Sequence, residues 1–226
     1  GKNAIIGSAR KWSNTVSTIG GSVPTNDIWA PKLFSVGSDV YLAISMRWGA
    51  DQTDDFGQSV RYLRMFYAKC NSLENMTFDE PLPFGVPFTQ SRIDANVYKV
   101  GSQYWLLCKN DVTGKTEIYK GSDPFDYSGV TPQVIAFSAK SEAQCLIAGT
   151  LPSGEEFLKI IVDVHHTGLT KSVTSFDSGV SWSTPAIVNF PHAVRHGTAI
   201  NLMNIREDDR DAARKSVKNF ISQSKP

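Results

Sequence analysis

One pattern of short strands recurs along this chain. A segment with a polar or aromatic residue near its start and apolar residues after it occurs at 28–33, 93–98, 142–147 and 196–200. After each of the first three copies, a Gly or Ser turn signal leads into a second apolar segment, at 40–44, 104–108 and 157–162. Third segments follow, and then Pro-containing fourth segments at 131–135 and 184–188, as suits a strand with a free edge.

Four strands in a unit of roughly fifty residues are typical of the blades of a β-propeller. We therefore expect an all-β chain with a four- to five-bladed β-propeller over residues 1–205. Segment 3–19 resembles a third and fourth strand, and segment 196–202 resembles an inner strand, so both ends of the chain are expected to share one blade.

The innermost strands of a propeller line its central channel, so the residues that open them are predicted to converge on one cleft. These residues are Trp29, Asp94, Glu142 and His196.

Residues 206–226 have a different pattern. Asp208 and Asp209 offer N-cap chemistry, and apolar residues then recur at helical spacing. We expect a short C-terminal helix packed on the propeller. A helix that binds a partner protein is the alternative.

Composition disfavours several classes of function. The 226 residues carry a net charge of +1, which provides no basic field for nucleic acid or anionic lipid. No apolar run has the length of a membrane helix. Cys70, Cys108 and Cys145 lack metal-ligand spacing and are predicted to be free thiols. We expect a monomer without nucleic-acid or membrane partners, in an extracellular or surface-associated location.

Two carboxylates stand at the predicted cleft. Glycoside hydrolysis needs one carboxyl group to protonate the leaving oxygen and another to activate water or attack the sugar. Asp94 and Glu142 open neighbouring inner strands and are candidates for such a pair. The alternative is that both side chains only hydrogen-bond backbone groups near the axis.

Other side chains near the predicted cleft are candidates for ligand binding. Trp29 is suited to stacking on a sugar face, or to a place in the core. Arg92 is suited to binding substrate or holding a carboxylate ionised, or it is a solvated loop charge. His196 is a candidate for binding a ligand or a hydrated cation, or a satisfied buried histidine. His165 and His166 are expected to point to opposite faces of a strand and to be loop or rim residues rather than functional ones.

Two loops have signatures of their own. Residues 175–182 match the Asp-box pattern, in which Ser175 and Asp177 satisfy the turn and Trp182 packs beneath it. This is a structural signal for a propeller. Residues 48–57 are expected to form a long polar loop within one blade, and their acidic residues lack the spacing of a calcium loop.

The chain resembles the family 43 glycoside hydrolases (arabinanases, arabinofuranosidases and xylosidases), which are five-bladed propellers. The resemblance covers residues 5–202. It implies that Glu142 is the general acid and that Asp94 orients it and tunes its pKa. The motifs that carry it are Ile28-Trp29-Ala30-Pro31, Ile93-Asp94-Ala95, Ser141-Glu142-Ala143 and Arg195-His196-Gly197.

The sequence departs from this family at two positions. The family's general base is an Asp on the first inner strand, and this chain is expected to start after that strand; Asp27 is the nearest substitute. Lys32 stands where the family usually has an acidic residue after the Pro. Without its base, an inverting hydrolase has no group to activate water.

Two hypotheses follow for function. The first is a hydrolase of arabinofuranosides or xylosides in an oligo- or polysaccharide, with Glu142 as acid, Asp94 as modulator and Asp27 as base. It needs no cofactor, and a central Ca²⁺ is left open. The second is a non-catalytic carbohydrate-binding or receptor-binding propeller that has lost its base. A sialidase-like enzyme and a protein-interaction propeller are further alternatives.

Overall fold

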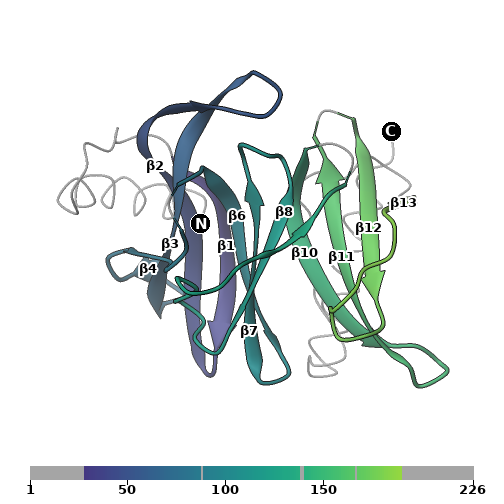
Figure 1. Cartoon of the computed structure of the whole chain (residues 1–226). Helices are drawn as coiled ribbons and strands as arrows, with labels where there is room; N and C mark the ends of the chain where they lie inside the picture. The colour runs from purple at the N-terminus through teal and green to yellow at the C-terminus, as the bar shows by residue number, and fades with distance from the viewer. Residues whose placement is uncertain (1–27, 88, 138–139, 166, 190–226) are drawn as a thin grey trace, which may run out of the picture.

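The computed structural model describes residues 28–87, 89–137, 140–165 and 167–189, which form three antiparallel sheets (Figure 1). These residues contain strands and no α-helix, so the all-β prediction is confirmed for them. None of them forms a helix that could cross a membrane. The shared blade predicted for the two chain ends, the boundary at residue 205 and the helix predicted over 206–226 lie outside the described residues.

Each sheet is a meander whose strands pair in the order of the sequence, as the repeat predicts. Blade 1 contains β1 (Ile28–Val36), β2 (Asp39–Thr53), β3 (Ser59–Ser72) and β4 (Thr77–Phe78), with β5 (Leu82–Pro83) also on β3. Blade 2 contains β6 (Arg92–Val100), β7 (Gln103–Asn110), β8 (Thr116–Gly121) and β9 (Gln133–Ile135). Blade 3 contains β10 (Ser141–Thr150), β11 (Glu156–Val164), β12 (Leu169–Ser175) and β13 (Ala186–Val188).

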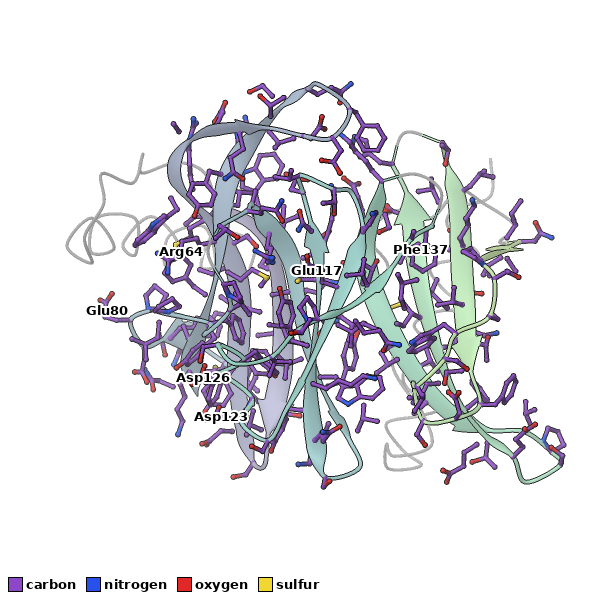
Figure 2. All side chains as sticks on the ribbon, in the orientation of Figure 1. Arg64, Glu80, Glu117, Asp123, Asp126 and Phe137 are labelled. Atoms are coloured by element: carbon purple, nitrogen blue, oxygen red, sulfur yellow. The ribbon has the colours of Figure 1, made fainter. Side chains whose placement is uncertain are left out.

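The blades pack face to face, and blade 2 is buried on both faces. Its strand β7 therefore contains a continuous run of apolar and aromatic residues, from Tyr104 to Cys108, instead of alternating. Leu106 and Cys108 join the core that packs against Phe34 and Met65 of blade 1. Trp105 and Leu107 point the other way, into the core shared with blade 3; Phe137 lies at this second interface (Figure 2).

The segment after β8 ties blade 2 back to blade 1. Asp123 and Asp126, labelled in Figure 2, cap its turns by accepting hydrogen bonds from the backbone N–H groups of Phe125 and Ser128. Phe125 stacks on Tyr67 of β3 with ring centroids 4.2 Å apart. Because this aromatic contact joins two blades, the loop contributes to the core and is more than a connection.

The prediction of a long loop at 48–57 is wrong. Strand β2 continues to Thr53 and β3 begins at Ser59, so only a short turn separates them. Register shifts between Arg47 and Gly49 and between Gly49 and Gln52 bend this long hairpin. Polar composition alone does not distinguish such a bulged, half-exposed hairpin from a loop.

The Asp-box prediction is confirmed at the end of β12. Ser175 Oγ accepts a hydrogen bond from Gly179 N–H at 2.7 Å, and the Asp177 carboxylate accepts from Ser181 N–H at 2.9 and 3.0 Å. Hydrogen bonds to its carboxylate from the Ser181 hydroxyl, from Ser181 N–H and from the Ser175 hydroxyl hold the pKa of Asp177 below its ordinary value. Trp182 packs against the core between blades 2 and 3.

The Asp-box turn also locks blade 3 onto blade 2. Lys120 of β8 donates to the carbonyl of Gly179 at 2.8 Å. The Gly179 backbone has φ +81°, and a Cβ atom there would lie 2.2 Å from the nearest ring carbon of Trp105. Only glycine allows this close approach of the turn to the Trp105 ring.

We predict that Gly179→Ala lowers the free energy of unfolding by about 2–5 kcal/mol, from left-handed backbone strain and the clash with Trp105. Gly154→Ala is the matched control, because Gly154 has φ +89° but open space around its Cβ position. It should show only the strain, about 1–2 kcal/mol. Urea unfolding measures both, and equal losses would contradict the proposed close contact.

Candidate functional site

Each of the three inner strands has a β-bulge near its start. The register shifts between Trp29 and Lys32 in β1, between Ile93 and Asn96 in β6, and between Glu142 and Cys145 in β10. In each bulge one residue has a positive φ: Ala30 (50°), Asp94 (64°) and Ala143 (52°). A bulge bends its strand and redirects side chains, so it decides where the functional groups point.

The bulges correct the predicted alignment of the repeat. Trp29, Ile93 and Glu142 are equivalent positions just before the bulge, and Asp94 corresponds to Ala30 and Ala143, one position later. Asp94 and Glu142 therefore occupy different places in their blades. Their functional groups still meet, because the Asp94 carboxylate reaches across to blade 3.

Charged side chains from the other two blades satisfy the backbone of the blade 3 bulge. Asp94 Oδ2 accepts a hydrogen bond from Ala143 N–H at 2.9 Å, next to Glu142 in the chain. Lys32 Nζ of blade 1 donates to the carbonyl of Gln144 at 3.1 Å. Burial lowers the pKa of Lys32, while Asp94 and Asp163 act in the opposite direction. The three blades therefore meet at the residues that follow Glu142.

The Glu142 side chain lies between two nitrogen groups, one from blade 2 and one from blade 3. Its Oε1 is 3.3 Å from Lys109 Nζ of β7 and 2.7 Å from Nδ1 of His165, which follows β11. Lys109 also pairs with Asp111 at 2.8 Å. The Glu142 side chain is 11% exposed and that of His165 is 29% exposed, so the cluster is open to solvent on one side.

The contacts keep Glu142 ionised. Its burial raises the pKa, but the hydrogen bond with His165 and the charge of Lys109 outweigh burial and bring the pKa from 4.5 to about 2. Burial of Lys109 lowers its pKa, but Asp111 and Glu142 outweigh this and raise it above the ordinary value. Near neutral pH the site holds a carboxylate and an ammonium group, and Glu142 has no proton to donate.

Lys109 was not foreseen from the sequence, and His165 was predicted to be a loop or rim residue rather than a functional one. The prediction for His165 missed its contact with Glu142. Glu142 pairs with Asp163 across β10 and β11, and Ser141 pairs with Val164, so His165 lies just beyond this last pair, two residues from the partner of Glu142. His165 can be recognised as a neighbour of Glu142 only when this register, which the bulge sets, is known.

Trp29 is 41% exposed, so the alternative of a core position is wrong. The Arg61 guanidinium lies 5.0 Å from the centre of its ring. Stacking of a sugar on Trp29 stays a prediction. Trp48 instead packs against a core cluster of blade 1.

Arg92 is buried, so it is not a solvated loop charge. Its Nε and Nη2 atoms donate to the Glu117 carboxylate at 2.7 and 3.5 Å. Its Nη1 donates to the carbonyls of Pro87 and Gln90. Tyr119 and Asn110 complete the hydrogen bonding of Glu117, which lies in the interior of the molecule (Figure 2). These contacts favour a structural role for Arg92 over contact with a ligand.

Asp27 and His196 lie outside the described residues, so their predicted places at the cleft stay predictions. Among residues 28–189, apart from the few positions that are not described, no group of three His, Cys, Asp or Glu side chains is arranged to hold a metal ion.

A groove of about 880 Å³ lies at the opposite end of blades 2 and 3. It is lined by the β6–β7 turn, the β10–β11 turn and Phe176 of the Asp-box. Because Glu142 and Lys109 lie at the other ends of these strands, the groove is separate from the charged cluster. The convergence of charged groups from three blades identifies the Glu142 cluster as the candidate site.

Comparisons with known proteins bear on the fold. No protein-family model and no curated protein sequence matches the chain. The structure is similar to that of an α-L-arabinofuranosidase from Lactobacillus brevis, with a TM-score of 0.54 and 18% identity over 73% of this chain and 57% of that one. It is also similar to an endo-arabinase from Bacteroides thetaiotaomicron VPI-5482, with a TM-score of 0.53 and 16% identity over 74% of this chain and 63% of that one.

These structures are β-propeller glycosidases, so the likeness supports the propeller fold expected from the sequence. At 18% and 16% identity it shows the fold alone. The chain matches 57% and 63% of the length of these two proteins.

We predict that Lys109→Met raises the pKa of Glu142 above about 2, because the attraction of the ammonium group is lost. Carboxyl carbon NMR titration measures this change. The pKa of Glu142 in the folded protein lies below its ordinary value of 4.5, so the ionised form of Glu142 stabilises the fold. This stabilisation is complete above about pH 4.5 and is lost as the pH falls to about 2. Lys99→Met, which removes an exposed lysine at the other end of β6, should leave the pKa unchanged. An unchanged pKa in Lys109→Met would contradict the ion-pair account.

We predict that Arg92→Met lowers the free energy of unfolding by about 3–5 kcal/mol, because it leaves the buried Glu117 carboxylate without its charged partner. The control is Arg47→Met, which breaks an exposed ion pair with Asp51 and should cost no more than about 1 kcal/mol. Thermal and urea unfolding provide the measurement. A variant that keeps wild-type stability and loses only ligand affinity would instead favour the substrate-binding role.

Proposed function

We propose that this protein binds an oligo- or polysaccharide at the Glu142 cluster, where the inner strands of the blades begin. The observation that carries the proposal is the ionised, partly exposed Glu142 carboxylate between Lys109 and His165. A carboxylate accepts strong hydrogen bonds from sugar hydroxyl groups, and the ammonium group of Lys109 donates them. The exposed Trp29 ring offers an apolar surface for a sugar face. Similarity in fold to an α-L-arabinofuranosidase supports a carbohydrate as the class of ligand.

Hydrolysis of arabinofuranosides or xylosides is the second candidate function. The hydrogen bond from Ala143 N–H to Asp94 favours it, because it sets Asp94 to orient the segment that carries Glu142. In this case Glu142 is the general acid, Asp94 its modulator and Asp27 the base. A general acid must hold a proton at the working pH. Ligand binding would have to separate Glu142 from His165 or Lys109 and so raise its pKa.

Several finer features belong to the same proposal. The propeller has four to five blades, with the two ends of the chain sharing one of them, and a helical tail packs on it. His196 lies at the cleft. The protein acts without an obligatory cofactor, with a central Ca²⁺ as the one option, as a monomer, outside the cell or on its surface. Nucleic acid and membrane are not its partners.

Binding of arabino-, xylo- and galacto-oligosaccharides, measured by calorimetry, tests the first function. Glu142→Gln keeps the shape of the side chain but removes its charge. We expect its dissociation constant to rise about 10- to 100-fold, the effect of losing charge-assisted hydrogen bonds. Glu156→Gln, which changes an exposed carboxylate at the far end of β11, is the matched control and should bind as the wild type does. Equal affinity of both variants would show that Glu142 does not take part in binding the sugar.

Turnover of aryl α-L-arabinofuranosides and β-D-xylosides separates the two functions. Hydrolysis by the wild type that is lost in Glu142→Gln would establish the second function and Glu142 as the acid. Binding without hydrolysis in either protein would support the first function alone. Absence of both binding and hydrolysis by the wild type would overturn both.

A further inference from the structure

The tip of the long β2–β3 hairpin of blade 1 is built around Asp54. Its Oδ1 accepts hydrogen bonds from the backbone N–H groups of Phe56 and Gln58 at 2.9 and 2.7 Å. Its Oδ2 is paired with the ammonium group of Lys140. The Asp54 side chain is 0% exposed, and the hydrogen bond from Lys140 lowers its pKa. A carboxylate removed from water in this way needs its charged partner.

Lys140 lies far from this hairpin in the sequence, just before β10 of blade 3. Besides Asp54, its ammonium group contacts Gln58 Oε1 at 3.1 Å and lies 5.1 Å from the centre of the Phe56 ring. The hairpin tip therefore surrounds the end of this side chain. The hairpin also hydrogen-bonds blade 2 at two points. Ser91 N–H, just before β6, donates to the Gln52 side chain, and Asp55 N–H donates to the carbonyl of Val112 in the β7–β8 turn.

The backbone of Lys140 leads directly to the Glu142 cluster. Its carbonyl accepts a hydrogen bond from His165 N–H at 3.0 Å, one rung beyond the pairing of Ser141 with Val164. This rung places His165 beside Glu142, where its Nδ1 approaches Oε1. Asp54, Lys140, His165 and Glu142 thus form a continuous series of contacts from the tip of blade 1 to the candidate site.

We propose that the Asp54–Lys140 ion pair is a positioning device that holds His165 against Glu142 and so shapes the carbohydrate site from outside it. The value of this device for binding rests on the proposed function, but its effect on His165 does not. Neither Asp54 nor Lys140 is placed in contact with the ligand.

The same hairpin contains a second carboxylate, Asp51, which serves as a control for the effect of Asp54 on His165. Asp51 pairs with Arg47 within the hairpin, and both side chains are partly exposed. An exposed pair of this kind contributes little to stability. Asp51→Asn removes one negative charge from the hairpin without touching Lys140, so it is a matched control for Asp54→Asn.

The experiment measures amide hydrogen exchange at His165 in the full chain, without ligand, for the wild type, Asp54→Asn, Lys140→Met and Asp51→Asn. Asn keeps an oxygen for the hairpin turn, so the tip itself should remain folded. We expect His165 N–H to exchange about tenfold faster in the first two variants and at the wild-type rate in Asp51→Asn. Lys140→Arg, which keeps the charge, should restore most of the protection. Wild-type exchange in Asp54→Asn and Lys140→Met would overturn the proposal.

The dissociation constant for the oligosaccharide is the second measurement. We expect it to rise roughly tenfold in Asp54→Asn, with the melting temperature close to that of Asp51→Asn. In Lys140→Met we expect a rise at least as large together with a lower melting temperature, because the buried Asp54 carboxylate loses its charged partner. Faster exchange with unchanged affinity would overturn the link to the binding site. If no variant and no wild type binds sugar, the proposed function fails, and the exchange result still decides whether the ion pair positions His165.

Discussion

The extra residue at the start of each inner strand is the constraint on which the candidate site depends. A bulge leaves backbone groups without partners in the sheet, and buried groups of this kind must be satisfied elsewhere. In blade 3 the partners are Asp94 of blade 2 and Lys32 of blade 1. The same local irregularity that frees the backbone thus brings two other blades to the residues beside Glu142. Burial between the blades makes these hydrogen bonds costly to break.

The contacts that position Glu142 also determine what it can do. Lys109 and His165 hold the carboxylate in place, and the same contacts lower its pKa to about 2. In this state Glu142 is an acceptor for hydroxyl groups and not a proton donor. Whether this site could hydrolyse a sugar or only bind it therefore depends on the groups that surround the Glu142 carboxylate. A ligand that moves Lys109 or His165 would convert one chemical role into the other.

The blades could be predicted from the sequence because their signals are local. Gly37 and Gly101 mark tight turns between apolar segments, and the Asp-box lies within a few consecutive residues. The sequence repeat aligned Asp94 with Trp29 and Glu142 instead of with Ala30 and Ala143, and this error also has a physical cause. Ala30 and Ala143 have positive φ, yet alanine is not a residue that signals this conformation, so the bulges are invisible in the sequence. The hairpin read as a loop at 48–57 was missed because its bulges disrupt the alternation of a regular strand.

The amino-acid sequence by itself determined that the described residues are all-β, that they repeat a four-stranded unit, and that Asp94 and Glu142 belong to neighbouring inner strands. Periodicity, turn residues and edge prolines act over a few residues and can be seen without a structure. The tertiary structure alone decided which groups meet Glu142. Lys109 reaches it from the neighbouring blade, and His165 reaches it through a register that a bulge shifts by one residue. Contacts between distant segments depend on how whole sheets pack, and no local pattern encodes them.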